Sequence, residues 1–65
     1  MKLKYEVQQR FMGEWENVWG KYFDNYREAN LSIEIYVYEK VGEMRAGLIN
    51  DAPKISDFRV AEVLL

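Results

Sequence analysis

The sequence predicts a single two-layer α+β domain with the element order ββαβ and a three-stranded antiparallel sheet of strand order 2-1-3. Three observations lead to this fold class. The first residues alternate between apolar and polar side chains, as a half-buried hairpin does. The middle of the chain carries helix-capping residues and an apolar period of three and four. The last residues alternate again, which indicates a third strand that closes the sheet.

The first expected strand covers residues 2–11. Its apolar face carries Leu3, Tyr5, Val7 and Phe11, and its polar face carries Lys2, Lys4, Glu6, Gln8 and Arg10. A second β-rich run, Trp15–Trp19, follows Met12-Gly13-Glu14. Glycine permits the backbone of a tight turn, so the two runs are expected to form a hairpin. Gly20 and Lys21 are expected to end or kink the second strand.

Trp15 and Trp19 are four residues apart on a strand and are therefore expected on one face. Which face depends on the loop. A two-residue loop at Gly13-Glu14 places both on the open face of the sheet beside Arg10, where they would suit a protein-binding hot spot. A three-residue loop, Met12 to Glu14, buries both under the helix, since one residue of register reverses every side chain. Both alternatives stay open from the sequence.

The stretch LSIEIYVY, residues 31–38, alternates like a strand but is predicted to be helical. Asn25 and Glu28 have the spacing of an N-cap and capping box, and Gly47 is a suitable stop. The helix is expected over residues 25–46. Its buried arc is expected to contain Tyr26, Ala29, Ile33, Val37, Val41, Met44 and Leu48, with Tyr36 on the flank.

The last strand is expected over residues 57–63, after a loop over residues 49–56 that contains Pro53. A right-handed crossover then sets the helix on one sheet face and leaves the other face open. No linker or repeat divides the chain, so residues 1–65 are expected to form one domain.

The composition narrows the range of protein classes to which this chain can belong. The chain has 65 residues, a net charge of −2, ten aromatic residues, and neither cysteine nor histidine. A core this small is marginal, which favours oligomerisation and makes a homodimer an alternative. No segment resembles a signal peptide or reaches the roughly 20 apolar residues of a membrane span. A cytoplasmic protein without a membrane partner is expected.

Catalysis is not expected, because common general bases and nucleophiles are missing. Ser32 and Ser56 lie in no nucleophile motif, and the glycines are isolated. The carboxylates are spread singly, so neither a metal site nor a cofactor is expected.

The back of the expected helix carries Leu31, Ile35 and Tyr38, roughly opposite Ile33 and Val37. Single exposed apolar side chains are ordinary on any surface, but three aligned over two helical turns indicate an interface. This row is called the apolar stripe below.

Three stretches, GEWENVW (13–19), FDNYREA (23–29) and DFRVAEV (57–63), resemble small uncharacterised proteins encoded by phages and prophages. Those proteins look like a hairpin with paired tryptophans, a capped helix and a closing strand. The resemblance implies a mobile-element protein in a bacterial cytoplasm. It implies no activity or catalytic residue for this chain. The helix departs from that group, where its outward face is usually polar.

The leading hypothesis is a small non-enzymatic interaction protein, an inhibitor or modulator of a host complex such as a bacterial defence system. Its expected partner-binding residues are Leu31, Ile35, Tyr38, Trp15, Trp19 and Arg10. One alternative is a nucleic-acid-associated domain that uses Lys2, Lys4, Arg10 and Arg59 on the open sheet face, although the lack of a basic groove makes nucleic acid the weaker choice. Another is a structural homodimer.

Overall fold

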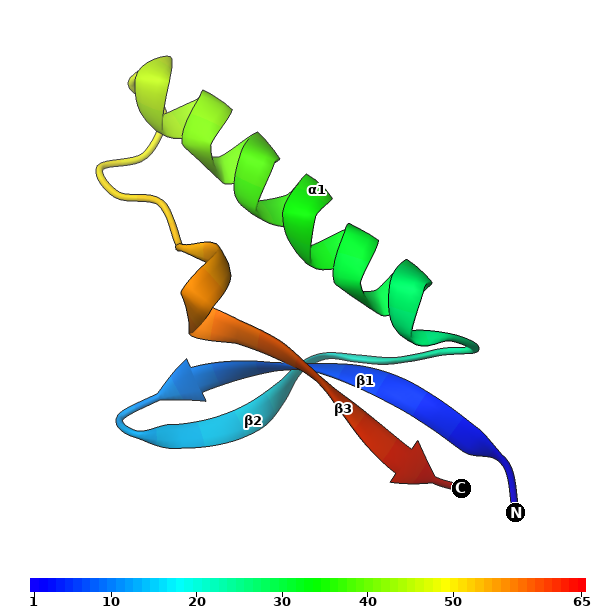
Figure 1. Ribbon diagram of the computed structural model, residues 1–65. Helices are drawn as coiled ribbons and strands as arrows, with labels where there is room; N and C mark the ends of the chain where they lie inside the picture. The colour runs from blue at the N-terminus through cyan, green and yellow to red at the C-terminus, as the bar shows by residue number, and fades with distance from the viewer.

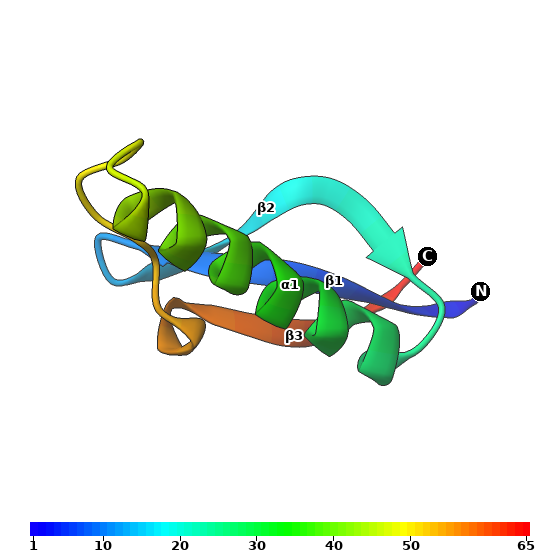
Figure 2. The same cartoon turned by 90° about the horizontal axis from the view of Figure 1, so that it is seen from above.

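The computed structural model describes all 65 residues and confirms the α+β fold (Figure 1). The elements are β1 (Leu3–Phe11), β2 (Glu14–Phe23), α1 (Tyr26–Arg45), a short 3-10 helix η1 (Ile55–Asp57) and β3 (Phe58–Leu64). The sheet has the predicted order β2-β1-β3, and β1 is antiparallel to both neighbours. α1 lies across one face of the sheet, and the opposite face is open (Figures 1 and 2).

The hairpin turn consists of Met12 and Gly13, because Phe11 pairs with Glu14 and Arg10 pairs with Trp15. Both turn residues have positive φ, 50° and 83°, as a type I′ turn requires. Neither loop expected from the sequence is therefore correct. Since Trp15 is opposite Arg10, its side chain lies on the open face of the sheet.

β2 is irregular in its middle, and this irregularity separates the two tryptophans. Between the pairs Gln8–Asn17 and Glu6–Tyr22, the single residue Val7 of β1 faces the four residues 18–21 of β2. An odd number of extra residues reverses the alternation of side chains. β2 bows away from β1 over this stretch (Figure 2). The expectation that Trp15 and Trp19 share a face is therefore wrong.

Gly20 is at the centre of this irregular stretch. It has a φ of 62°, a conformation that glycine adopts without steric cost. Its N–H donates to the Asn17 side-chain oxygen at 2.7 Å. The predicted kink at Gly20 is present, but the strand does not end there and continues to Phe23.

α1 has the ends that the sequence predicts. The Asn25 side chain accepts a hydrogen bond from the Glu28 N–H at 2.8 Å, which caps the first turn. After the helix, Gly47 adopts a φ of 80° and ends it. The strand-like residues 31–38 are thus helical, because the caps and the packing of one face outweigh their β propensity.

The core contains five buried residues, Val7, Ala29, Ile33, Val37 and Phe58. Tyr36, Val41 and Trp19 pack against them from the sides. α1 diverges from the sheet toward its carboxyl end (Figure 1), so Met44 and Leu48 are exposed rather than buried as expected. Tyr26 is also exposed and only contacts the edge of Tyr5.

β3 begins at Phe58, one residue later than expected, because η1 takes up Asp57. The loop before it contains Pro53, as predicted. At the other end of the sheet, Lys2 and Leu65 exchange two backbone hydrogen bonds of 2.9 Å. The two chain ends therefore lie side by side (Figure 1).

Candidate functional site

The apolar stripe lies on the outer face of α1, where the sequence predicts it. Leu31 and Ile35 are each 51% exposed, and Tyr38 is 83% exposed. The residues that α1 buries, Ala29, Ile33 and Val37, face the sheet instead. Nothing in the fold covers the stripe, so its apolar area stays available to a partner.

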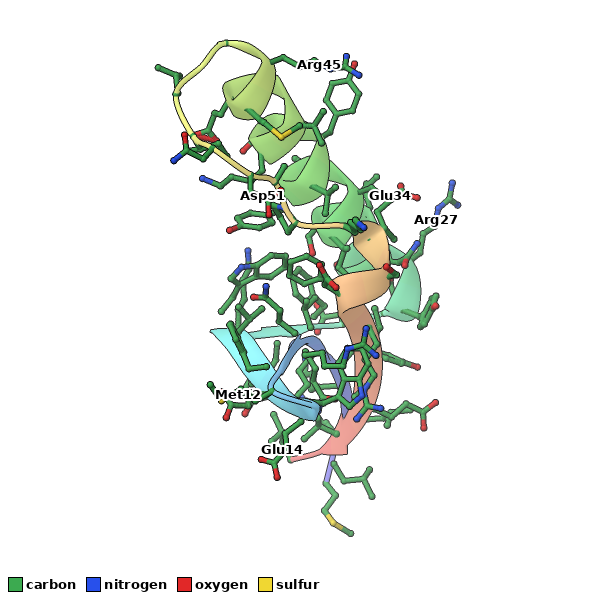
Figure 3. The ribbon with its side chains drawn as sticks, turned by 90° about the vertical axis from the view of Figure 1, so that its left-hand side faces the viewer. Met12, Glu14, Arg27, Glu34, Arg45 and Asp51 are labelled. Carbon is green, nitrogen blue, oxygen red and sulfur yellow. The ribbon has the colours of Figure 1, made fainter.

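Two carboxylates flank the centre of the stripe. Glu34 and Glu39 line a shallow surface hollow together with Ile35 and Tyr38. The Glu34 side chain projects away from the sheet (Figure 3). The two ion pairs of the protein join Lys4 to Asp24 and Lys40 to Glu43, so neither flanking carboxylate is paired. The hollow combines an apolar floor with unpaired negative charge.

A second cluster lies on the open face of the sheet, and each strand contributes to it. The guanidinium carbon of Arg59, on β3, lies 4.4 Å from the centre of the Trp15 ring on β2. The guanidinium carbon of Arg10, on β1, lies 5.7 Å from the same ring. Neither arginine takes part in an ion pair. We call Arg10, Trp15 and Arg59 the guanidinium cluster.

Gln8 orients Arg59 within this cluster. The Arg59 Nε donates to the Gln8 Oε1 at 2.7 Å, and the Gln8 Nε2 donates to a Glu6 carboxylate oxygen at 2.9 Å. One of the two hairpin alternatives from the sequence places Trp15 beside Arg10 on the open face, but neither predicts that Arg59 lies over the same ring. The position of Arg59 follows from the register of β1 and β3, in which Gln8 is opposite Arg59. The sequence does not determine this register.

Trp19 does not belong to either surface. Its ring stacks on Phe58 at a centroid distance of 6.2 Å and meets the edge of Tyr36 at 5.4 Å. It is a partly buried residue that packs against the core between α1 and the sheet. The prediction that Trp19 binds a partner beside Trp15 is therefore not compatible with its position.

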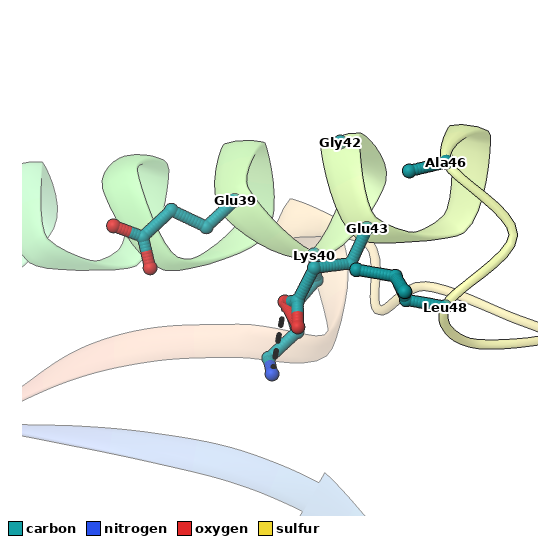
Figure 4. Close-up of a pocket in the computed structure, with 6 residues that line it drawn as sticks. All are labelled: Glu39, Lys40, Gly42, Glu43, Ala46 and Leu48. Carbon is teal, nitrogen blue, oxygen red and sulfur yellow. Dashed lines mark ion pairs between the residues drawn. The ribbon is translucent and has the colours of Figure 1, made fainter.

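A second open hollow, near the carboxyl end of α1, is lined by both charged and apolar residues (Figure 4). Lys40 and Glu43 form an ion pair across one helical turn, with 3.1 Å between Nζ and the carboxylate oxygen. The hydrogen bond and charge of Glu43 raise the pKa of Lys40. Because Lys40 and Glu43 already pair with each other, only Glu39 among the charged residues of this hollow lacks an ion pair.

At the opposite end of the molecule, the Lys4 ammonium pairs with Asp24, just before the N-cap of α1. The hydrogen bond from Lys4, with its charge, lowers the pKa of the Asp24 carboxyl. This contact ties the start of the helix to β1. No three acidic side chains come together in a group that could hold a metal ion.

No protein-family model, curated protein or solved structure matches this chain. α1 lacks the apolar length needed to cross a bilayer.

Proposed function

We propose that this protein acts by binding another protein rather than by catalysis, and that the apolar stripe of α1 is its docking surface. The observation that carries the proposal is the exposure of Leu31, Ile35 and Tyr38 in one row on a helix whose opposite face is packed. Aligned apolar side chains of this kind anchor a helix in the groove of a partner.

The charge around the stripe favours one kind of partner. Glu34 and Glu39 border the hollow beside Ile35 and Tyr38 and have no cation of their own. A groove with an apolar floor and lysine or arginine at its rim is complementary to this surface. We therefore propose a heterologous protein with such a basic rim as the partner.

The same charge argues against self-association through the stripe. In a symmetric antiparallel pair of helices centred on Ile35, the same flank of each helix meets. Glu34 would then approach Glu34 of the second copy, and like charges in contact are unfavourable. A homodimer through this face is the weaker alternative.

The resemblance to phage-encoded proteins supports a more specific role, as a modulator of a complex in a bacterial host. In this role the protein would act in the host cytoplasm. It would occupy a surface of a host complex, for example one of a defence system, through the apolar stripe.

The test is a capture experiment from bacterial lysate with the wild-type protein, Ile35→Asp and Tyr38→Glu. Burial of an isoleucine stabilises a complex by roughly 1.5–3 kcal/mol, so Ile35→Asp should weaken capture about tenfold or more. Leu48→Asp is the matched control, because Leu48 is 73% exposed but lies outside the stripe.

A prey protein that wild type and Leu48→Asp retain and the two stripe variants lose would support the proposal. The double variant Glu34→Lys with Glu39→Lys reverses both charges beside the stripe and should fail to capture the same prey protein. Equal capture by all variants, or a change only in self-association, would contradict it. Circular dichroism checks that each variant stays folded.

A further inference from the structure

We propose that the guanidinium cluster on the open sheet face binds a carboxylate-rich segment of a protein. This surface is on the opposite side of the sheet from α1, so the inference is independent of the apolar stripe. It assigns a chemical class of ligand, an acidic peptide, to Arg10, Trp15 and Arg59.

The two arginines of the cluster have no internal counter-ion. The chain carries eleven acidic residues and a net charge of −2, yet neither Arg10 nor Arg59 pairs with any of them. Both guanidinium groups instead lie over one indole ring, at 5.7 and 4.4 Å from its centre. Two uncompensated cations held at one point form a local site for an anion.

Arg59 is held in place before any ligand binds. Its Nε is engaged by Gln8 at 2.7 Å, and the Trp15 ring supports its plane. A guanidinium held in this way keeps its terminal N–H groups free, in the planar fork that matches a carboxylate. Because the side chain is already ordered, a ligand has less conformational entropy to remove.

The surroundings of the cluster suit an acidic peptide better than a single-stranded nucleic acid. Nucleic-acid grooves combine a track of cations with free aromatic faces on which bases stack. Here Arg59 already lies over the indole ring, Lys4 is paired with Asp24, and the Glu6 carboxylate lies beside Gln8. Two cations suit one or two carboxylates rather than a phosphate backbone.

The test uses the ¹⁵N-labelled full-length protein and follows the indole N–H resonances of its two tryptophans. The probe is a short capped oligoglutamate peptide, and an oligoglutamine peptide of equal length is the uncharged control. Oligoglutamate should shift the Trp15 resonance and leave that of Trp19 unmoved, because Trp19 packs against α1 on the other side of the sheet. Trp15→Phe assigns the two resonances.

Arg59→Gln should weaken binding about tenfold, since it removes charge-assisted hydrogen bonds. Arg59→Lys should recover only part of the affinity, because lysine keeps the charge but not the fork. Arg27→Gln removes the same charge from α1, away from the open sheet face (Figure 3), and should leave the affinity unchanged.

Three results would overturn the proposal. The first is no shift of the Trp15 resonance with oligoglutamate, which would mean that the cluster only packs on the sheet face and binds no acidic peptide. The second is a loss of affinity in Arg27→Gln equal to that in Arg59→Gln, which would indicate attraction by overall charge alone. The third is stronger binding of oligothymidylate than of oligoglutamate, which would assign the face to nucleic acid instead.

Discussion

At the scale of single residues, three backbone positions decide on which side of the sheet the two tryptophan side chains lie. Met12 and Gly13 form the two-residue turn that directs Trp15 to the open face. Gly20 lies in the irregular stretch that returns Trp19 to the core. The sequence shows glycines at both places but does not determine the loop length, and one residue of register reverses each assignment. This is why the positions of the tryptophans could not be predicted.

Met12 offers a direct test of the turn. It has a φ of 50° and is fully exposed, so a side chain that tolerates the left-handed region should fit better there. Met12→Asn should raise the free energy of unfolding by about 1 kcal/mol, which is roughly 4–8 °C in Tm for a small domain. Thermal unfolding measures the change. Met12→Leu is the control and should have no effect; equal stability of the Asn variant and wild type would argue against a type I′ turn.

The Lys4–Asp24 pair predicts a pH dependence at residue scale. Because the folded-state pKa of Asp24 is lowered from 3.8, the contact stabilises the native state above that value. The stabilisation is lost as the pH falls through the lowered pKa. Lys4→Met should move the Asp24 titration midpoint upward, as followed by carboxyl ¹³C shifts. Lys21→Met serves as the control, and an unmoved midpoint in Lys4→Met would show that the pair does not form in solution.

At the scale of elements, the sequence was sufficient for the helix and for the central strand. Asn25 and Gly47 mark the ends of α1, and both behave as their residue types predict. The predicted buried arc is confirmed for Ala29, Ile33 and Val37. It is wrong for Tyr26 at the start of the helix and for the residues beyond Val41, where α1 diverges from the sheet. Periodicity reports which side chains share a face of a helix, whereas divergence of the helix from its neighbour is a tertiary property that no local pattern contains.

Gly42 tests whether the outer face of α1 is open to solvent along its length. A Cβ at this position meets no atom within 4 Å, and glycine inside a helix costs roughly 0.5–1 kcal/mol relative to alanine. Gly42→Ala should therefore stabilise the protein by about that amount in chemical denaturation. Gly47→Ala, at a φ of 80°, should destabilise it instead. A loss of stability in Gly42→Ala would mean that the outer face is covered.

At the scale of the whole molecule, the balance between core and surface favours a binding protein. Only five of 65 residues are buried, and the molecule measures 45 × 24 × 17 Å. The apolar stripe and the guanidinium cluster lie on opposite sides of this thin body. The sequence predicted the stripe because helical spacing alone defines it. It predicted Trp15 beside Arg10 only as one of two alternatives and did not predict Arg59 at this ring, because the three residues meet through the pairing of three strands.

The central claim is that α1 docks on a heterologous protein through Ile35 and its neighbours. Site-specific photo-crosslinking tests this claim most directly, with a photoreactive amino acid in place of Ile35 and, as the control, in place of Leu48. In bacterial lysate, position 35 should give one discrete adduct with a different protein, identified by mass spectrometry, and position 48 should not. An adduct of two copies of this chain, the same adduct from both positions, or none from position 35 would contradict the account.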